Sequence, residues 1–272
     1  MVAISAVICA RNEAEKIEEC LRSVRWAEEV VLFDMESSDA TVERARPWVD
    51  RIVSLAPQPI VELVRQRMLQ EATHDWVLII DPDERVSAAL AGQLRRLLEG
   101  ERDFAAVNLP IRNYIFGRGM KSPGWYPDLH PRLVDRRRTT WPATIHATPQ
   151  VAGTIIDLDP HAGGEILHYN YSSVSEFLQK MDRYTDLEAS RLRENGRPFR
   201  WYKLLYHPLK EVWLRVIVRR GYRDGVAGVI FSLLMGVYYL VAYAKLWELE
   251  RADEPAEAAR ATRLAAIEEQ AQ

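Results

Sequence analysis

The spacing of apolar residues in the first hundred positions constrains the fold of this chain more than any other feature. Short uninterrupted apolar runs alternate there with stretches in which apolar residues recur every three or four positions. Parallel strands joined by crossover helices produce this alternation, because a strand buried on both faces is apolar throughout. We therefore predict an α/β fold that binds its ligand at the carboxyl ends of the strands. The strands are expected at 2–9, 29–35, 51–56 and 76–81, and the helices at 17–24, 41–48, 61–72 and 87–99.

The rhythm changes after residue 100, where strands separated by loops rich in Gly, Pro and Trp predict a mixed, partly antiparallel region. A helix is expected at 174–195, followed by Gly196 and Pro198 as stop signals. We place the domain boundary there, with an α/β domain at 1–198 and a helical extension at 199–272. The strands of the mixed region are expected at 104–116, 129–135, 153–158 and 165–169.

Composition excludes some classes of protein. The chain has 272 residues, 48% of them hydrophobic, which is enough for a sizeable core without metal or disulfide. Its 36 Lys and Arg against 39 Asp and Glu argue against a general nucleic-acid binder. Two cysteines are too few for a disulfide scaffold and suggest a reducing compartment. The apolar N-terminus lacks a basic start and a cleavage site, so we interpret it as a buried strand and expect a cytoplasmic protein.

The sharpest chemical signal is the sequence DPDE at 81–84, directly after the apolar run WVLII. Two carboxylates, Asp81 and Asp83, alternate with a proline at the end of a strand. Carboxylate oxygens suit a hard cation such as Mg or Mn, whose other ligands are often substrate phosphates. The alternative is the start of a helix, where an early Pro and acidic residues are also favoured.

A second acid, Asp34, ends the second expected strand and is followed by a polar loop. An acid at this place can accept hydrogen bonds from a nucleotide base or ribose, while Ser38 or Asp39 caps the next helix. A plain turn is the alternative. Neither GxGxxG nor GxxxxGK[ST] follows any strand, which disfavours dinucleotide oxidoreductases and P-loop enzymes.

A third signal is the loop GWYPD at 124–128, which combines two aromatic side chains with Asp128. Such a loop can stack a sugar ring and hold a general base beside it. The alternative is aromatic core packing with an exposed acid. Taken singly, His146 and His168 are interpreted as structural residues.

Together and in this order, the motifs resemble those of the family 2 glycosyltransferases, which have the GT-A fold. ARNE at 10–13, Asp34 with SSDAT at 37–41, and WVLIIDPDE at 76–84 carry this resemblance. The later half resembles the subgroup that adds glucose or a related sugar to the lipopolysaccharide inner core, and together the two halves cover most of residues 3–190. Its motifs are GWYPD at 124–128, PRL at 131–133, Trp141, IH at 145–146, HY at 168–169, and positions 177–185.

This resemblance implies roles for matching positions. Asp128 would be the catalytic base, and a Mg or Mn cation would be bound by Asp83, Asp81 and His168. The nucleotide-sugar donor would contact Ala10, Asn12, Glu13, Asp34 and Asp81. The acceptor saccharide would contact Trp125, Tyr126, Arg132 and His146.

Two positions depart from the family pattern. Ala147 follows His146 where the subgroup has a Glu, so a carboxylate expected near the acceptor is missing, and Ala40 replaces a Gly. Ala147 leaves open an inactive membrane-associated scaffold of the same fold. A sugar nucleotidyltransferase is the other alternative, but it would need a Gly-rich loop with a basic residue where this chain has ARNE at 10–13.

The expected reaction is inverting transfer of a hexose, glucose by resemblance, from a UDP-sugar to a lipid-linked saccharide. The uncharged segment 226–244, roughly 28 Å long as a helix, follows a cluster of basic residues. It predicts a membrane span, a helix lying on the membrane surface, or a helix between subunits of a homo-oligomer. We therefore expect the cytoplasmic face of the inner membrane as a partner surface.

Overall fold

The computed structural model describes residues 2–100, 103–142 and 148–270, with side chains as far as Ala252. The chain forms two compact units, Met1–Tyr114 with Gly124–Asn170, and Ile115–Pro123 with Tyr171–Gln272. The second unit therefore begins well before the boundary predicted at residue 198. The reason is helix α5 (Val174–Glu194), whose Ala189 and Leu192 pack against Tyr243 and Leu246 of the C-terminal helix.

The first half of the first unit alternates strands and helices as predicted. Strands β1 and β2 are parallel, β1 also pairs in parallel with β4, and β2 with β3, so the spatial order is β3-β2-β1-β4. The strands are β1 (Ile4–Ala10), β2 (Glu29–Asp34), β3 (Arg51–Ser54) and β4 (Trp76–Ile80). The helices are α1 (Ile17–Val24), α2 (Thr41–Ala45), the 3-10 turn η1 (Arg46–Trp48), α3 (Glu62–Glu71) and α4 (Ala88–Glu99).

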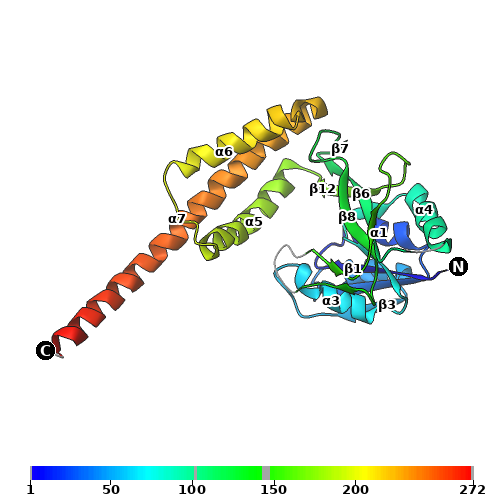
Figure 1. Cartoon of the computed structure of the whole chain (residues 1–272), viewed down its shortest axis with the longest axis horizontal. Coiled ribbons are helices and arrows are strands. Elements are labelled where there is room, and N and C mark those ends of the chain that lie inside the picture. The colour runs from blue at the N-terminus through cyan, green and yellow to red at the C-terminus, as the bar shows by residue number, and fades with distance from the viewer. Residues whose placement is uncertain (1, 101–102, 143–147, 271–272) are drawn as a thin grey trace. The chain divides into compact units, whose positions relative to one another are not determined.

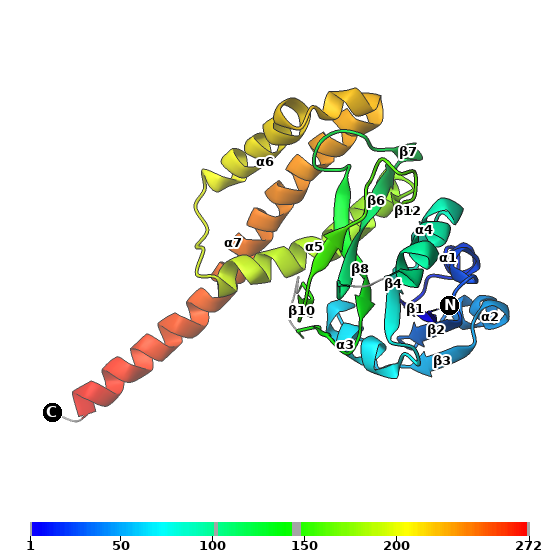
Figure 2. The same cartoon turned by 45° about the vertical axis from the view of Figure 1, so that its right-hand side comes forward.

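The second half of this unit completes a mixed sheet. Strand β8 is antiparallel to both β4 and β6, and β12 lies between β6 and the short strand β5. These strands are β5 (Glu84–Val86), β6 (Ala106–Ile115), β8 (Asp128–Asp135), β11 (Ile155–Asp157) and β12 (Ile166–Tyr171), with a separate hairpin of β9 (Thr139–Thr140) and β10 (Gln150–Val151). The predicted mixed sheet flanked by helices is thus confirmed (Figures 1 and 2).

The acidic segment after β4 does not begin a helix, so that interpretation of DPDE is wrong. Residues 84–86 form β5, which pairs antiparallel with β12. Helix α4 begins only at Ala88, where the side chain of Ser87 accepts a hydrogen bond from the backbone N–H of Leu90. Ser87 therefore supplies the cap, and the acids are left for other contacts.

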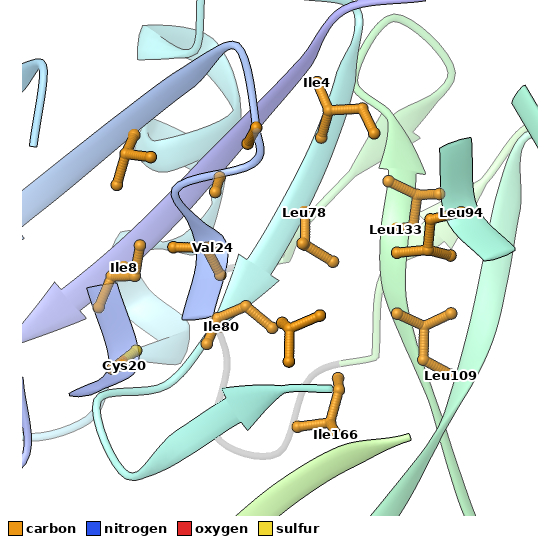
Figure 3. Close-up of a cluster of buried hydrophobic side chains, with 14 of the residues drawn as sticks. Ile4, Ile8, Cys20, Val24, Leu78, Ile80, Leu94, Leu109, Leu133 and Ile166 are labelled. Carbon is orange, nitrogen blue, oxygen red and sulfur yellow. The ribbon is translucent and has the colours of Figure 1, made fainter. Parts of the chain in front are cut away.

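The core lies on both faces of the sheet, as the continuous apolar strands predict. On one face Ile4, Leu78 and Leu133 pack with Val24 of α1 and Leu94 of α4 (Figure 3). On the other face Val7, Val77 and Ile79 pack with Met68 and Leu69 of α3. Burying each such side chain contributes about 1.5–3 kcal/mol, so both helix layers hold the sheet rigidly beneath the loops at its ends.

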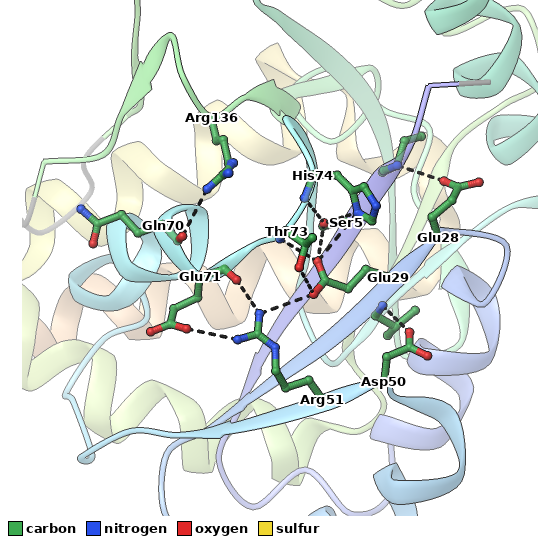
Figure 4. Close-up of polar contacts among 12 residues, drawn as sticks. Ser5, Glu28, Glu29, Asp50, Arg51, Gln70, Glu71, Thr73, His74 and Arg136 are labelled. Atoms are coloured by element: carbon green, nitrogen blue, oxygen red, sulfur yellow. Dashed lines mark hydrogen bonds and ion pairs between the residues drawn. The ribbon is translucent and has the colours of Figure 1, made fainter.

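A polar cluster lies at the amino ends of the parallel strands (Figure 4). Both carboxylate oxygens of the buried Glu29 have partners: Oε2 accepts from the Ser5 hydroxyl at 2.5 Å and the Thr73 N–H at 2.8 Å, and Oε1 from the Thr73 hydroxyl at 2.7 Å. Arg51 lies 3.4 Å from Oε1, and His74 Nδ1 lies 3.0 Å from the Ser5 hydroxyl. This cluster ties β1, β2 and β3 to the start of β4.

The second unit is helical apart from the short strand β7 (Arg118–Gly119). Its elements are α5 (Val174–Glu194), α6 (Lys203–Trp213), the π turn η2 (Leu214–Val218), the 3-10 turn η3 (Gly221–Asp224) and α7 (Gly225–Gln270). Helix α6 lies alongside α7 (Figures 1 and 2). Asp224 accepts hydrogen bonds from the N–H groups of Lys121 and Ser122, which ties segment 115–123 to these helices.

The predicted apolar segment 226–244 forms part of α7. Within the described residues, one stretch, Gly221–Ala252, is long enough to cross a membrane and contains an 18-residue segment with a mean hydropathy of 2.0. Close helix packing explains its small residues: a Cβ atom at Gly228 would collide with the carbonyl oxygen of Gly221.

Candidate active site

The loops after β1 and β2 meet at the carboxyl edge of the sheet, because Ala10 and Asp34 are in register at the ends of these strands. Asn12, which has a positive φ of 57°, accepts from the Ser38 N–H with its side-chain oxygen at 2.8 Å. The N–H of Glu13 donates to the Thr41 hydroxyl at 2.8 Å. The predicted donor-binding residues of these two loops therefore lie in one cross-linked surface.

Asp34 is buried but incompletely hydrogen-bonded. Its Oδ2 accepts from the N–H of Ser37 at 3.2 Å, whereas Oδ1 has no partner among the residues the structure describes. Leaving a buried acceptor unpaired costs about 1–3 kcal/mol, so such atoms call for an explanation. A donor N–H or O–H of a ligand would satisfy this oxygen.

Asp81, at the end of β4, is held by two arginines. Arg65 of α3 donates to Oδ1 at 2.7 Å and Arg132 of β8 to Oδ2 at 3.0 Å. Arg132 also contacts the fully buried Glu84 at 2.6 Å, and Oε2 of Glu84 accepts from the N–H of Asp81 at 2.9 Å. Arg132, which was expected to contact the acceptor, therefore lies with the acidic residues that follow β4.

The charges in this group shift the acidity of its members in opposite directions. Burial raises the pKa of Asp81, but the charges of Arg65 and Arg132 outweigh it and hold that pKa well below its usual range. Burial raises the pKa of Glu84, and Arg132 only partly offsets this effect. Arg65 Nε and Nη1 and Arg132 Nε have no hydrogen-bond partner within the described ranges. The arginines thus keep Asp81 ionised while retaining unused donors.

Asp83 and His168 form a second pair beside this group. The register of β5 with β12 places His168 opposite Glu84, and His168 Nε2 lies 3.4 Å from Oδ1 of Asp83. Burial lowers the pKa of His168, but its hydrogen bond to Asp83 and the nearby carboxylates raise it overall. Across the part of the chain with described side chains, no group of three or more His, Cys, Asp or Glu residues forms a complete metal site. Metal binding by Asp81, Asp83 and His168 stays a prediction.

Asp128, the candidate base, begins β8. Its Oδ1 lies 2.9 Å from His130 Nε2, and its Oδ2 accepts from Asn113 Nδ2 at 3.1 Å. Asn113 in turn accepts from Asn170 Nδ2 at 2.6 Å. Burial raises the pKa of Asp128, but the hydrogen bond and charge of His130 outweigh it and lower the pKa overall. The carboxylate is therefore ionised at neutral pH and able to accept a proton.

The aromatic residues before Asp128 have different surroundings. The Trp125 carbonyl accepts from Asn113 at 3.3 Å, which connects the loop to Asp128. The Tyr126 hydroxyl donates to the Pro160 carbonyl at 2.7 Å, and the Arg112 guanidinium lies 4.1 Å from the centre of its ring. His146 and Ala147, the other predicted acceptor-side positions, lie outside the described residues.

Several site residues were not predicted. Arg65, Asn113 and His130 contact predicted residues, yet none belongs to a motif that singles it out in the sequence, and Glu84, although part of DPDE, was given no role. The parallel half could be anticipated, because its strands end at one edge. The contacts of Asn113 and Asn170 depend on the antiparallel pairing of β6 with β8 and on β12. The sequence predicted these strands only with approximate bounds and did not predict how they pair.

This sheet, with its acidic site at the carboxyl ends of β2 and β4, has the GT-A fold of nucleotide-diphospho-sugar transferases. A solved structure of similar fold is a mannosyltransferase from Pyrobaculum calidifontis in complex with GDP-Man and Mn²⁺, with a TM-score of 0.52 and 14% identity. The similarity covers 90% of this chain and 86% of that one. Residues 5–153 match the model of glycosyl transferase family 2, and the chain belongs to that family.

Two glycosyltransferases of known sequence extend the similarity over nearly the whole chain. The lipopolysaccharide core biosynthesis glycosyltransferase LpsC of Rhizobium meliloti (strain 1021) is 25% identical over 252 residues, covering 90% of this chain and 92% of the relative. An uncharacterized glycosyltransferase of Rickettsia prowazekii (strain Madrid E) is 24% identical, covering 92% of this chain and 88% of the relative. Both matches extend beyond the α/β domain into the helical part of this chain.

Proposed function

We propose that this chain is a metal-dependent, inverting hexosyltransferase that transfers glucose from a UDP-sugar to a lipid-linked saccharide, such as a lipopolysaccharide core. The observation that carries the proposal is the gathering of Asp34, Asp81 and Asp83 at one edge of the sheet. Membership of glycosyl transferase family 2 supports the transfer reaction. The name of the relative LpsC supports a lipopolysaccharide acceptor.

In this proposal the donor binds across the carboxyl ends of β1, β2 and β4. The unpaired Oδ1 of Asp34 accepts a hydrogen bond from the nucleotide base. Asp81, kept ionised by Arg65 and Arg132, supports the donor beside it, and the unused N–H groups of the two arginines add positive charge near the diphosphate. The loop of Ala10, Asn12 and Glu13 closes the other side of this donor site.

The cation is assigned to Asp83 and His168. Their donor atoms lie 3.4 Å apart, close to the separation of about 3 Å between adjacent ligands of one octahedral cation. A carboxylate suits both Mg and Mn. An imidazole nitrogen is a better ligand for a transition-metal ion such as Mn than for Mg. A bound cation would neutralise negative charge developing on the departing diphosphate. The mannosyltransferase of similar fold, which was solved with GDP-Man and Mn²⁺, supports this assignment.

Asp128 is proposed as the base. As the acceptor oxygen forms its bond to the anomeric carbon, the bond from that carbon to the diphosphate breaks, and the hydroxyl proton moves to Asp128. Asn113 and His130 each hold one carboxylate oxygen, which orients the group. Attack from the face opposite the diphosphate inverts the configuration of the sugar.

A lipid-linked acceptor places the enzyme at a membrane. We propose that it acts at the cytoplasmic face of the inner membrane, with the helical unit as the part that associates with lipid or with a second copy of the chain. The apolar stretch of α7 supports this location.

The proposal is tested first on the donor side. Purified full-length protein is heated with a panel of UDP- and GDP-sugars, each with Mn, with Mg and with chelator, because a ligand that binds only the native state raises the melting temperature. UDP-glucose with Mn is expected to cause the largest increase. Transfer from the best donor to extracted lipopolysaccharide cores is then measured. Stabilisation by no nucleotide sugar, or full transfer in chelator, would contradict the proposal.

A further inference from the structure

Helix α6 and the turn η2 carry a row of exposed apolar side chains on the outside of the helical unit. Leu205 is 62% exposed, Leu209 66% and Trp213 59%. These positions follow one another at intervals of four residues, so they share one face of the helix. The same face continues to Ile217 in η2. A solvated helix of a soluble protein normally has the opposite arrangement.

The inner face of α6 and η2 contains polar groups that are paired within the unit. Glu211 and Arg215 form an ion pair at 2.5 Å, and both side chains are largely buried. The hydroxyl of Tyr243 on α7 lies 2.9 Å from His207 Nε2. Helix α6 therefore packs against its own unit through both polar side chains and apolar ones such as Leu204, while a second set of apolar side chains points away from that unit.

The composition of the outer face indicates what covers it. It is rich in Trp and Tyr, the residues that favour the boundary between lipid and water, and no acidic residue is exposed between positions 201 and 223. Exposed basic residues accompany the aromatic ones. The exposed aromatic residues are Trp201, Tyr202, Tyr206, Trp213 and Tyr222, and the exposed basic ones are Lys210, Arg220 and Arg223.

We propose that this outer face, residues 201–223, is the membrane-binding surface of the protein and lies in the headgroup region of an anionic bilayer. Its leucines and aromatic rings enter the upper acyl region, and its Lys and Arg contact lipid phosphates. The proposal refines the membrane partner named above by assigning it to α6, whereas the sequence pointed to segment 226–244.

The packing of α5 against α7 argues for a surface position over a span. Lys245 of α7 pairs with Asp182 and Asp186 of α5, each at 2.7 Å, and both acids are mostly exposed. The hydroxyl of Tyr238 donates to the carbonyl of Tyr184, which lies between the two acids in sequence, so the acids flank the apolar segment and would enter the membrane with it if α7 crossed the bilayer. Charged groups at membrane depth cost several kcal/mol each, so this arrangement favours α7 as a support for α6.

Helix α7 also has an exposed apolar stripe, which provides a matched control. Leu233 and Val237 are exposed on it, and the positions of the stripe alternate in steps of three and four. This spacing is that of a helix–helix seam, and the stripe lacks aromatic residues before Trp247. A second copy of the chain would suit the stripe better than lipid does.

The test measures flotation of the full-length protein with vesicles of phosphatidylcholine containing phosphatidylglycerol. Leu205→Glu with Leu209→Glu is expected to lower the partition coefficient by roughly tenfold or more, because two inserted side chains acquire charge. Leu233→Glu with Val237→Glu is expected to leave it within about threefold. Equal losses in the two variants would overturn the assignment to α6.

Wild-type protein supplies two further tests that do not depend on the variants. Pure phosphatidylcholine vesicles should bind it roughly tenfold or more weakly, because several basic side chains lose their anionic partners. Lipids brominated near the headgroup should quench tryptophan fluorescence more than lipids brominated at mid-membrane. Equal binding to neutral vesicles, stronger deep quenching, or a dimer that the α6 variant dissociates would each overturn the proposal.

Failure of this inference can be told apart from failure of the proposed function. The α6 variant should keep the increase in melting temperature that a UDP-sugar causes in wild type, because residues 201–223 are not assigned to the donor site. Loss of vesicle binding with intact donor binding supports the inference. Vesicle binding by a protein that binds no nucleotide sugar would contradict only the proposed function.

Discussion

The two ends of the parallel strands both hold buried carboxylates, but only one end satisfies them. At the amino ends, both oxygens of Glu29 have hydrogen-bond partners from Ser5 and Thr73. At the carboxyl ends, Oδ1 of Asp34 and three nitrogen atoms of Arg65 and Arg132 have no partner among the described residues. The carboxylate at the amino ends is thus fully paired, although Nε of nearby Arg136 has no partner, whereas at the carboxyl ends a carboxylate oxygen itself is left unpaired.

The difference indicates which end binds ligand. A completed buried network stabilises the fold, whereas unpaired buried groups cost free energy that the rest of the core must offset. A ligand that supplies the missing partners explains why such groups gather around Asp34 and Asp81. If this comparison is right, substitutions at the carboxyl ends should affect activity most, and those at the amino ends should affect stability most.

Asp83→Ala should have the largest effect on activity. The variant loses the carboxylate assigned to the cation, so we expect transfer to fall by roughly three orders of magnitude or more while the fold is kept. Turnover with Mn and the melting temperature are measured together. Asp75→Ala, which removes an exposed acid at the other end of the sheet, is the control and should retain activity. Normal turnover by Asp83→Ala would disprove the metal assignment.

Asp128→Asn should rank second. The amide is nearly isosteric but cannot take the proton, so kcat is expected to fall by roughly two to four orders of magnitude. Donor binding, measured by the shift in melting temperature, should be unchanged. Unimpaired turnover would show that Asp128 is not the catalytic base, and Glu84 would be the next residue to test.

Asp34→Ala should have a smaller effect and a different pattern. The proposed contact of Asp34 with the nucleotide base is made equally in the ground and transition states. Loss of this contact is therefore expected to raise the donor KM by roughly ten- to a hundredfold and to change kcat little. Steady-state kinetics with varied donor concentration separate the two constants. An unchanged KM with a collapsed kcat would place Asp34 outside the nucleotide site.

The sequence predicted the parallel half of the fold well, together with the edge of the sheet at which the acidic residues gather. Strands buried on both faces are recognisable as apolar runs, and parallel strands bring their carboxyl ends to one edge, so Asp34 and the acids after β4 could be grouped in advance. The later predictions were approximate. Strand β5 was missed, because three residues with two charges look like a loop until β12 pairs with them.

Residues that act through long-range pairing could not be predicted from their neighbours in sequence. Arg65 is an ordinary polar residue of a helix until α3 packs beside β4, and Asn113 reaches Asp128 only because β6 and β8 are antiparallel. The predicted boundary and the compact units differ for the same reason, since Gly196 and Pro198 mark the end of a helix but not which unit that helix joins.

Glu29→Gln should have the smallest effect on activity and tests the amino-end cluster. Burial raises the pKa of Glu29, but hydrogen bonds from Ser5 and Thr73 outweigh it and lower the pKa below the ordinary value of 4.5. A lowered pKa stabilises the fold above the unfolded-state value, and this contribution is lost as the pH falls through the folded-state value. At neutral pH the variant should therefore lose about 1–3 kcal/mol in free energy of unfolding.

The measurement is urea unfolding of wild type and variant at pH 7 and at steps below pH 4.5, with turnover measured at pH 7. The difference in unfolding free energy should shrink toward the acid end, because protonated Glu29 no longer gains from its ionised contacts. The kcat should stay within about twofold of wild type, because Glu29 and Asp34 lie at opposite ends of strand β2. A Glu29→Gln variant of normal stability and greatly reduced kcat would contradict the comparison. The cluster around Glu29 would then take part in the reaction, and function would no longer distinguish the two ends of the strands.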